Sequence, residues 1–271
     1  MGENHHEVVR REFSKQASRF GRKDLALTSR EYLQWMVDNL DLRPHFSVLD
    51  VAAGTGHLAR AIAPHVKRVV AVDLTTEMLL KGSHEAAEDG ITNVTFEQGL
   101  AENLPYPHDA FDMVVSRFSI HHFEDPQMQI AEMVRVCRPE GRVAVIDLVS
   151  PDDETLAAAY NRLERRRDPS HTRALSVAEL RRAVRDAGLE IVHTVSREVE
   201  VSVKPWLDLT GIEPEMRRAI LDELTHELEG LTTTGMRPFM RDNELMFVQT
   251  WVVVVGVKRR EPKTGLQDWT K

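Results

Sequence analysis

The residues with the clearest capacity for chemistry lie between positions 47 and 58. Asp50 ends a short apolar run, and Gly54 and Gly56 follow it before a segment of helical composition begins. Glycines let the backbone come close to a ligand, and the helix that follows presents free N–H groups at the same place. A carboxylate at the end of a strand suits a ligand with positive charge and hydroxyl groups better than it suits a pyrophosphate. The pattern therefore predicts a ligand-binding turn between a strand and a helix.

Two binding motifs match the spacing of this turn. As Gly54-x-Gly56-x-x-Ala59 it matches the dinucleotide fingerprint, and Asp73 follows at the ~20-residue distance expected of a ribose-binding acid. Counted from Asp50, the same letters give D-x-A-x-G-x-G, with an acid at the strand end. A nicotinamide-dependent dehydrogenase would carry a glycine at that strand end and a catalytic Tyr-x-x-x-Lys, which this sequence lacks. The dehydrogenase stays an alternative.

Three histidines have the chemistry of a general base. His121 and His122 follow a buried apolar run, and His171 lies in the polar segment 168–173. Imidazole titrates near neutral pH, so each of them could take a proton from a substrate. Packing of the His-His-Phe segment and a simple helix-ending turn at 168–173 are the competing interpretations. No third ligand stands at the spacing of a metal site, so we predict no metal.

The composition narrows the class of protein. The chain has 271 residues, a net charge of −8, and 42% hydrophobic and 29% charged residues, which are ordinary globular values. Its negative charge argues against binding of nucleic acid through phosphates and does not exclude a small-molecule substrate. The longest apolar run, 251–257, is too short to span a membrane, the N-terminus has no signal-peptide pattern, and Cys137 is the single cysteine. These features predict a cytoplasmic protein without internal disulfides, and a homodimer stays open.

Strand and helix patterns alternate along the first half of the chain, which is typical of a parallel sheet. The second half adds charged and amphipathic helices and two further strands. The predicted strands cover residues 47–51, 68–73, 93–99, 110–116, 142–147, 189–203 and 246–257. The predicted helices cover residues 8–40 with a break at Gly21, then 58–63, 74–87, 127–137, 152–167, 176–188 and 206–229.

We expect a single domain with three functional segments. Residues 1–45 form an N-terminal helical lid, 46–150 the ligand-binding core, and 151–271 complete the sheet with helical insertions that cap the substrate. Phe13 and Phe20 recur at helical spacing and either cover a ligand or pack in the core. The same two interpretations hold for a set of apolar residues further on: Trp206, Met236, Phe239, Met240 and Trp251.

An ordered series of motifs runs from the glycine turn to residue 142. Its members are Asp50–Gly56, Val72-Asp73, Gln98–Tyr106, Phe111–Val114, His121–Phe123 and Arg138–Arg142. Together they resemble the class I S-adenosylmethionine (SAM)-dependent methyltransferases of the type-11 group, near the ubiquinone/menaquinone-biosynthesis C-methyltransferases. The departure is Ala52, where the family usually has a glycine. The resemblance implies a Rossmann-like, seven-stranded, mostly parallel sheet with helices on both faces and an antiparallel last strand.

The same resemblance implies SAM as the cofactor and assigns its binding residues. The turn from Asp50 to Gly56 would hold the methionine part, and Asp73 would accept hydrogen bonds from the ribose hydroxyls. Leu100 stands where the family often has an aspartate that binds adenine, so either Glu102 replaces that contact or backbone and packing hold the ring. The implied cofactor-binding residues are Asp50, Ala52, Gly54, Thr55, Gly56, Asp73, Leu74, Met78, Gly99, Leu100, Ala101, Ser116 and Arg117.

The function implied is methyl transfer to a small molecule through carbon, nitrogen, oxygen or sulfur. Alignment and exclusion of water supply most of the catalysis, and a base is needed only for a protonated nucleophile. The catalytic candidates are His122, His121 and His171, with His122 first because the segment after the fourth strand lies nearest the methyl group in the family. Three other functions stay open: a different use of SAM such as intramolecular cyclisation, a non-catalytic SAM-binding subunit, and the dehydrogenase.

Overall fold

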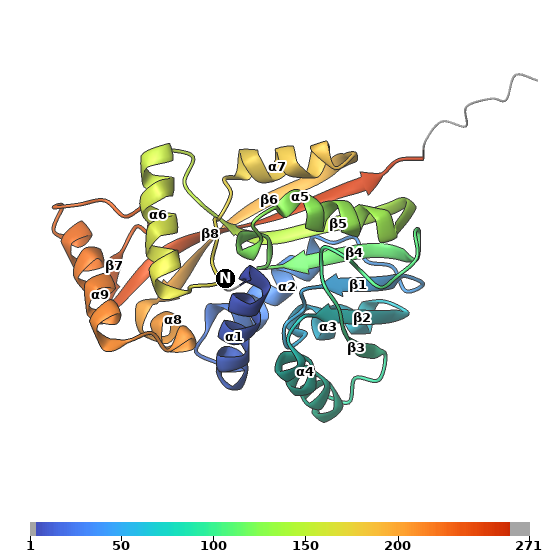
Figure 1. The fold of residues 1–271 in the computed structure, drawn as a ribbon, viewed down its shortest axis with the longest axis horizontal. Coiled ribbons are helices and arrows are strands. Elements are labelled where there is room, and N and C mark those ends of the chain that lie inside the picture. Colours follow the sequence, from blue (N-terminus) through green and yellow to red (C-terminus); the bar gives the residue numbers. More distant parts are fainter. Residues whose placement is uncertain (1–3, 261–271) are drawn as a thin grey trace, which may run out of the picture.

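The computed structural model describes residues 4–260, so the outer ends of the predicted segments 1–45 and 151–271 lie outside the described residues. An eight-stranded sheet forms the centre, in the order β3-β2-β1-β4-β5-β8-β6 with β7 paired to β8 (Figure 1). Its strands are β1 (Ser47–Val51), β2 (Arg68–Asp73), β3 (Val94–Gln98), β4 (Phe111–Arg117), β5 (Cys137–Val149), β6 (Leu189–Ser202), β7 (Phe239–Arg241) and β8 (Glu244–Lys258). The α-helices are α1 (His5–Gln16), α2 (Arg30–Asp38), α3 (His57–Ile62), α4 (Thr76–Glu88), α5 (Pro126–Val136), α6 (Glu154–Arg167), α7 (Val177–Asp186), α8 (Val203–Thr210) and α9 (Pro214–Leu228).

The sheet confirms the predicted Rossmann-like architecture. Strands β1 to β5 are parallel to their neighbours, and β8 runs antiparallel to β5 and β6. The strand beyond the predicted seven is β7, which pairs with the start of β8 through a hairpin at Asp242 and Asn243. Both hairpin residues have positive φ (48° and 64°), as a tight two-residue hairpin turn requires. A strand of three residues is too short to show an alternating pattern in the sequence.

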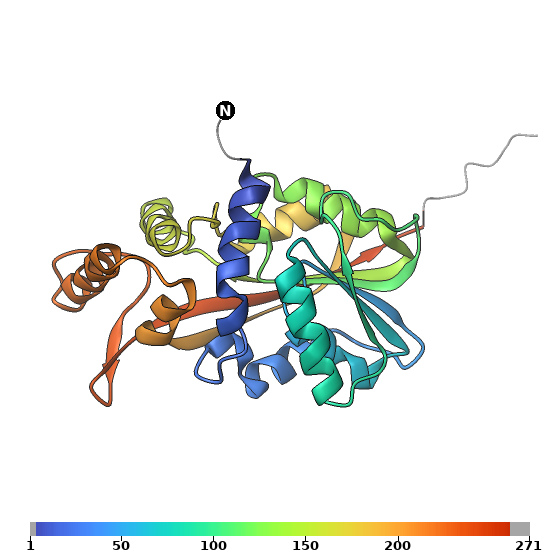
Figure 2. The same cartoon turned by 60° about the horizontal axis from the view of Figure 1, so that its bottom comes forward.

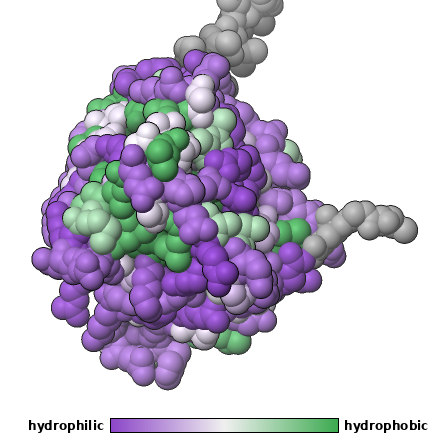
Figure 3. All heavy atoms as spheres, turned by 90° about the vertical axis from the view of Figure 1, so that its left-hand side faces the viewer, coloured by the Kyte–Doolittle hydropathy of each residue, from purple (hydrophilic) through white to green (hydrophobic). Residues whose placement is uncertain are grey.

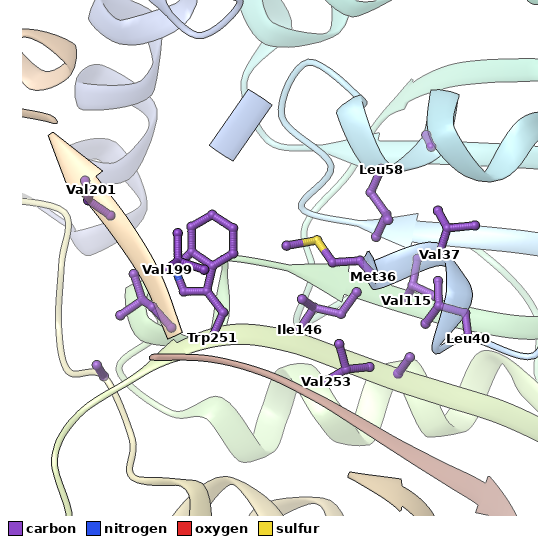
Figure 4. Close-up of a cluster of buried hydrophobic side chains, with 14 of the residues drawn as sticks. Met36, Val37, Leu40, Leu58, Val115, Ile146, Val199, Val201, Trp251 and Val253 are labelled. Carbon is purple, nitrogen blue, oxygen red and sulfur yellow. The ribbon is translucent and has the colours of Figure 1, made fainter. Parts of the chain in front are cut away.

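Helices cover both faces of the sheet, each over its own apolar cluster (Figure 2). On one face Met36 of α2, Leu40 just after α2 and Leu58 of α3 pack over Val115 and Ile146 of the sheet, and all five side chains are at most 2% exposed (Figure 4). Helices α5 and α7 cover the opposite face. Burial on both sides explains why the central strands are continuous apolar runs rather than alternating ones.

The second half of the chain extends the molecule beyond the carboxyl ends of the parallel strands. The long strands β6 and β8 project to one side and carry α8, α9 and β7 (Figure 1). Helix α1 lies between this extension and α4 and contacts α4 and α8 (Figures 1 and 2). The far end of the extension shows apolar patches among hydrophilic side chains (Figure 3), and Leu228, Leu231 and Met240 are exposed there. The lid and cap roles of these segments stay predictions.

Several predicted boundaries are wrong. The fifth strand begins at Cys137 and not at 142, and Val203 begins α8 instead of ending a strand. The predicted helix 206–229 is two helices, α8 and α9, because Gly211 adopts a left-handed conformation and Pro214 starts a new helix. Helix α5 ends at Val136, one residue before its predicted end, and Cys137 begins β5 as a buried free thiol. Within residues 4–260, no helix has the length and apolar character needed to cross a membrane.

The glycine turn is packed against α4, which gives a test of the fold. A Cβ on Gly82 of α4 would come within 2.6 Å of the carbonyl oxygen of Thr55 and within 2.6 Å of the Phe96 ring. Gly82→Ala should therefore lower the free energy of unfolding by about 1–3 kcal/mol, the usual cost of overpacking. Urea denaturation measures it, with exposed Ser83→Ala on the same helix as the control. An unchanged midpoint for Gly82→Ala would contradict this packing.

Candidate active site

A large cavity opens at the carboxyl ends of β1, β2 and β4, where open α/β sheets place their ligands. It contains about 1590 Å³ of empty space, part of it open to solvent. The segments that follow β1, β2 and β3 line one part, which we call the β1 half. Helices α1 and α8, the segment after β4, the α6–α7 connection and β8 line the other part, which we call the α8 half.

The structure brings most of the predicted site residues together in the wall of this cavity. They come from the ends of four different strands, so only the parallel sheet makes them neighbours. The predicted residues that line the cavity are Asp50, Ala52, Gly54, Asp73, Leu74, Gly99, Leu100, Ala101, Arg117, His121 and His122.

Five predicted residues lie outside the cavity lining. Ser116 is part of β4, and its hydroxyl donates to the Val51 carbonyl of the neighbouring strand β1 (2.7 Å). The Nε2–H of His171 donates to Asn161 Oδ1 (2.8 Å), behind the wall. The five residues are Thr55, Gly56, Met78, Ser116 and His171.

The carboxylate of Asp50 is the most unusual group of the β1 half. Its side chain is 1% exposed, and neither oxygen has a hydrogen-bond partner among the described residues. Burial raises the pKa of Asp50 to about 7, although the positive charge of Arg117 acts in the opposite direction. A buried carboxylate without a partner costs free energy unless a ligand compensates it. A cationic or donor-bearing ligand in the cavity would compensate the carboxylate of Asp50, as a bound proton does.

The turn after β1 is held by Asp73, at the end of the neighbouring strand. The backbone N–H of Gly54 donates to Asp73 Oδ2 (2.7 Å), and the N–H of Thr75 donates to Oδ1 (2.8 Å). Burial raises the pKa of Asp73, which these hydrogen bonds partly offset. Ala52 has a φ of 54°, a left-handed conformation that a glycine adopts without strain. Ala52 thus holds, at the cost of strain, a conformation that a glycine at this position would adopt freely.

The loop after β3 and the end of β4 complete the β1 half. Leu100 and Ala101 line the cavity, and the Nε2–H of His6 donates to Glu102 Oε1 (3.0 Å). Arg117 donates through Nη1 to the carbonyl of Leu27 (3.0 Å), which leaves other donors of its guanidinium for a ligand. Burial lowers the pKa of Arg117 to about 10, while Asp50 acts to raise it, so the group stays charged at neutral pH.

The adjacent histidines have opposite environments. The Nδ1–H of His121 donates to Asp147 Oδ1 (2.6 Å). Burial acts against its imidazolium, but the charge and hydrogen bond of Asp147 outweigh burial and raise the pKa of His121. The Nδ1–H of His122 donates to the Ser170 carbonyl (3.0 Å), and burial together with His121 lowers the pKa of His122 to about 3. His121 is therefore the stronger base of the two.

Several residues of the α8 half were not predicted. Phe118 packs edge-on against Trp251 (ring centroids 4.6 Å apart) and has a φ of 54°, a strained conformation for a bulky residue. No sequence signal marks Phe118. Gln16 could have been found, because it lies one helical turn after Phe13 on α1 and Phe13 lines the cavity. Trp206 and Trp251 also line the cavity, which agrees with the pocket interpretation of these two residues.

The fold and this cavity define a class I methyltransferase. A profile of the methyltransferase domain matches residues 48–141. The methyltransferase YcgJ of Bacillus subtilis, whose function is uncharacterised, is 32% identical over 248 residues, 91% of this chain and 98% of its own length. Its crystal structure superposes with a TM-score of 0.77 at 30% identity, over 86% of this chain and all of that one. The chain belongs to the class I SAM-dependent methyltransferases.

Two further comparisons add a relative that matches half of the chain and a solved structure that shares the fold. The ubiquinone/menaquinone biosynthesis C-methyltransferase UbiE of Hahella chejuensis is 34% identical over 137 residues, 49% of this chain and 55% of the relative. A Haemonchus contortus phosphoethanolamine N-methyltransferase 2 solved with SAM shares the fold (TM-score 0.63) at 13% identity, over 96% of this chain and 61% of that one. Groups of three or more His, Cys, Asp or Glu that could hold a metal ion are absent from residues 4–260.

Ligand binding should be linked to the protonation of Asp50. The folded protein holds this proton more tightly than the unfolded chain, because the pKa rises from 3.8 to about 7. The contribution of this protonation to the stability of the folded protein is therefore complete below pH ~3.8 and is lost as the pH rises through ~7. A cationic ligand favours the carboxylate, so its affinity should increase with pH up to ~7 and then level off.

Calorimetry with SAM in buffers of different ionisation enthalpy measures this linkage. We expect proton release on binding below pH ~7 and none well above it. Asp50→Asn should lose this proton release and gain stability relative to wild type at alkaline pH. The same proton release in wild type and Asp50→Asn would exclude Asp50 as its source.

Proposed function

We propose that this protein transfers the methyl group of SAM to a small-molecule substrate. The observation that carries the proposal is the unpartnered, buried carboxylate of Asp50 beside Arg117, in a cavity of the methyltransferase fold. The methionine part of SAM carries an ammonium and a carboxylate, which these two side chains complement in charge. When bound, SAM supplies a methyl group already activated by its sulfonium.

The remaining cofactor contacts follow from the geometry of the β1 half. Each oxygen of Asp73 accepts one backbone N–H and keeps a further lone pair for a ribose hydroxyl. Leu100 and Ala101 offer an apolar surface and backbone groups to adenine. Glu102 lines the same place, so it supports the adenine contact that Leu100 lacks. We also propose a cytoplasmic location. We propose a substrate other than nucleic acid, and the net charge of −8 supports this part of the proposal.

Where the substrate arrives protonated, we infer that His121 is the base, in place of our first choice His122. Asp147 fixes the tautomer of His121 and leaves Nε2 as the nitrogen that takes a proton. A group with a pKa of about 3, as in His122, is a weak base at neutral pH. His171 lies behind the cavity wall and donates its Nε2–H to Asn161. Asp147 acts as a positioning residue.

Binding of SAM tests the proposed cofactor against the dehydrogenase alternative. Calorimetry should show binding of SAM and none of NAD. Asp73→Ala should weaken SAM by at least about tenfold, or ~1.4 kcal/mol, because charge-assisted hydrogen bonds to the ribose are lost. Circular dichroism must show that this variant stays folded, since Asp73 also holds the turn after β1. NAD binding without SAM binding would reverse the assignment.

Transfer of the methyl group itself separates an enzyme from a SAM-binding subunit and from a cyclase. Radiolabel moving from methyl-labelled SAM to a product supports methyl transfer. SAM that binds and returns unchanged while the substrate isomerises would indicate the cyclisation alternative.

His121→Gln tests the base. The rate constant should fall by ~10²–10⁴ while SAM affinity stays near wild type, because the variant keeps bulk and polarity but loses the titrating nitrogen. The wild-type rate should rise with pH through a pKa above 6.5, and this dependence should vanish in His121→Gln. His122→Gln and His171→Gln serve as controls and should keep the pH profile. If all three variants keep activity within about tenfold of wild type, none of these histidines is the base, and catalysis consists of alignment and desolvation.

A further inference from the structure

The walls of the α8 half are mainly aromatic and aliphatic. Phe13 and Phe20 come from the N-terminal segment, Phe118 follows β4, and Trp206 and Trp251 come from α8 and β8. Rings of this kind bind apolar surface and make face or edge contacts with a flat ligand. Since the proposed function assigns the β1 half to SAM, the α8 half is where the substrate binds, and its substrate class rests on that proposed function.

Arg167 is the cation of the α8 half, and its charge is balanced within the protein by the carboxylates of Glu164 and Asp168 (3.0 and 4.0 Å). Its Nε donates to Glu164 Oε2 (3.0 Å) and its Nη1 to the carbonyl of Trp206 (3.4 Å). The guanidinium lies 4.9 Å from the Trp206 ring centroid, and the residue is 8% exposed. Arg117, at the boundary with the β1 half, is balanced by Asp50. A phosphate or carboxylate on the substrate would therefore find no free positive charge among the described lining residues.

Buried carboxylates around Arg167 make this half still less suited to an anion. Asp168 lines the cavity at 2% exposure, and Glu164 lies behind it at 0%. Asp168 accepts from the backbone N–H of Ser170 (2.9 Å) and from Gln16 Nε2 (3.4 Å). Two carboxylates with one guanidinium leave an excess of negative charge, which repels an anionic substrate in a low-dielectric site.

Neutral polar groups in the wall are also satisfied within the protein. Gln249 donates through Nε2 to Tyr160 Oη (3.3 Å) and Glu164 Oε1 (3.2 Å). Its Oε1 accepts from the indole N–H of Trp251 (3.1 Å). These groups present a neutral, already bonded surface and offer a substrate little polar recognition.

The indole N–H of Trp206 is the exception. Trp206 lines the cavity at 6% exposure, and its Nε1 has no hydrogen-bond partner among the described residues. Of the cavity-lining residues described, Asp50 and Trp206 alone carry a buried polar side-chain atom without a partner. Asp50 matches the ammonium of SAM in the β1 half. An indole nitrogen can only donate, so Trp206 calls for an oxygen atom on the molecule in the α8 half.

We propose that the substrate is an uncharged, mainly apolar molecule whose hydroxyl or carbonyl oxygen accepts a hydrogen bond from Trp206 Nε1. Phosphorylated and carboxylated substrates are excluded by the lack of a free cation and by the carboxylates of Asp168 and Glu164. Trp206 is then a specificity-determining residue.

The test compares 1-naphthol with 1-naphthyl phosphate, which share a ring and differ in charge. Both are titrated by calorimetry, at neutral pH, into protein saturated with S-adenosylhomocysteine. We expect 1-naphthol to bind and 1-naphthyl phosphate to bind at least about tenfold more weakly, because an unpaired anion would have to be desolvated. Equal or tighter binding of the phosphate would overturn the proposal, and so would failure of 1-naphthol to bind.

Trp206→Phe isolates the hydrogen bond, since it keeps an aromatic ring and removes the N–H. It should weaken 1-naphthol by about threefold to tenfold, while naphthalene, which has no oxygen, should bind wild type and variant alike. Trp35→Phe, outside the cavity lining, is the matched control and should leave both affinities unchanged. Equal loss for naphthol and naphthalene in Trp206→Phe would show packing alone and overturn the role of the N–H.

Failure of this inference is distinguishable from failure of the proposed function. Binding of S-adenosylhomocysteine in the first step tests the cofactor half by itself. If it binds and the phosphate probe is preferred, only the uncharged substrate class is wrong. If it does not bind, the assignment of the β1 half to SAM fails.

Discussion

A carboxylate buried without a partner at the carboxyl end of β1 is the constraint on which the site depends. Folding places Asp50 in the centre of the sheet, where water cannot compensate it and Arg117 does so only through its charge. That arrangement costs stability above neutral pH and becomes favourable only when a cationic ligand is bound. The neighbouring turn is held in one conformation by Asp73 and by packing against Gly82.

The cavity is divided by the chemistry of its two walls. Charged groups in the β1 half are left available, whereas in the α8 half Arg167 and Gln249 are bonded within the protein. Helix α1 contacts both halves: Gln16 donates to Asp168 and the Nε2–H of His5 donates to the carbonyl of His122 (2.6 Å) in the α8 half, and the Nε2–H of His6 donates to Glu102 Oε1 (3.0 Å) in the β1 half. Such a division suits a reaction between a charged cofactor and an uncharged substrate. Each molecule then loses its hydration only in the half whose side chains match its charge.

The three candidate histidines show that residue type alone does not identify a catalytic base. The sequence identified His121, His122 and His171 as candidate bases because each carries an imidazole, and the resemblance to the family ranked His122 first. Asp147, distant in sequence, raises the pKa of His121, while burial lowers those of the other two. The basicity of each histidine depends on the side chains packed around it. The local sequence carries no information about side chains that come from other strands.

The sequence by itself determined the central parallel sheet and the glycine turn, because these depend on local patterns: apolar runs, paired glycines and acids at strand ends. The expectation of SAM came from the resemblance of the ordered motifs to class I methyltransferases, since the spacing of the turn alone also fits a dinucleotide fingerprint. Only the tertiary structure decided that β7 forms and that 206–229 breaks at Gly211. It also decided that Ser116 and Met78 lie outside the cavity and that Phe118 and Gln249 face it. These outcomes depend on long-range packing and on which hydrogen-bond partners folding supplies. The unpartnered indole of Trp206 is of the same kind, since a missing partner becomes visible only when every neighbour is in place.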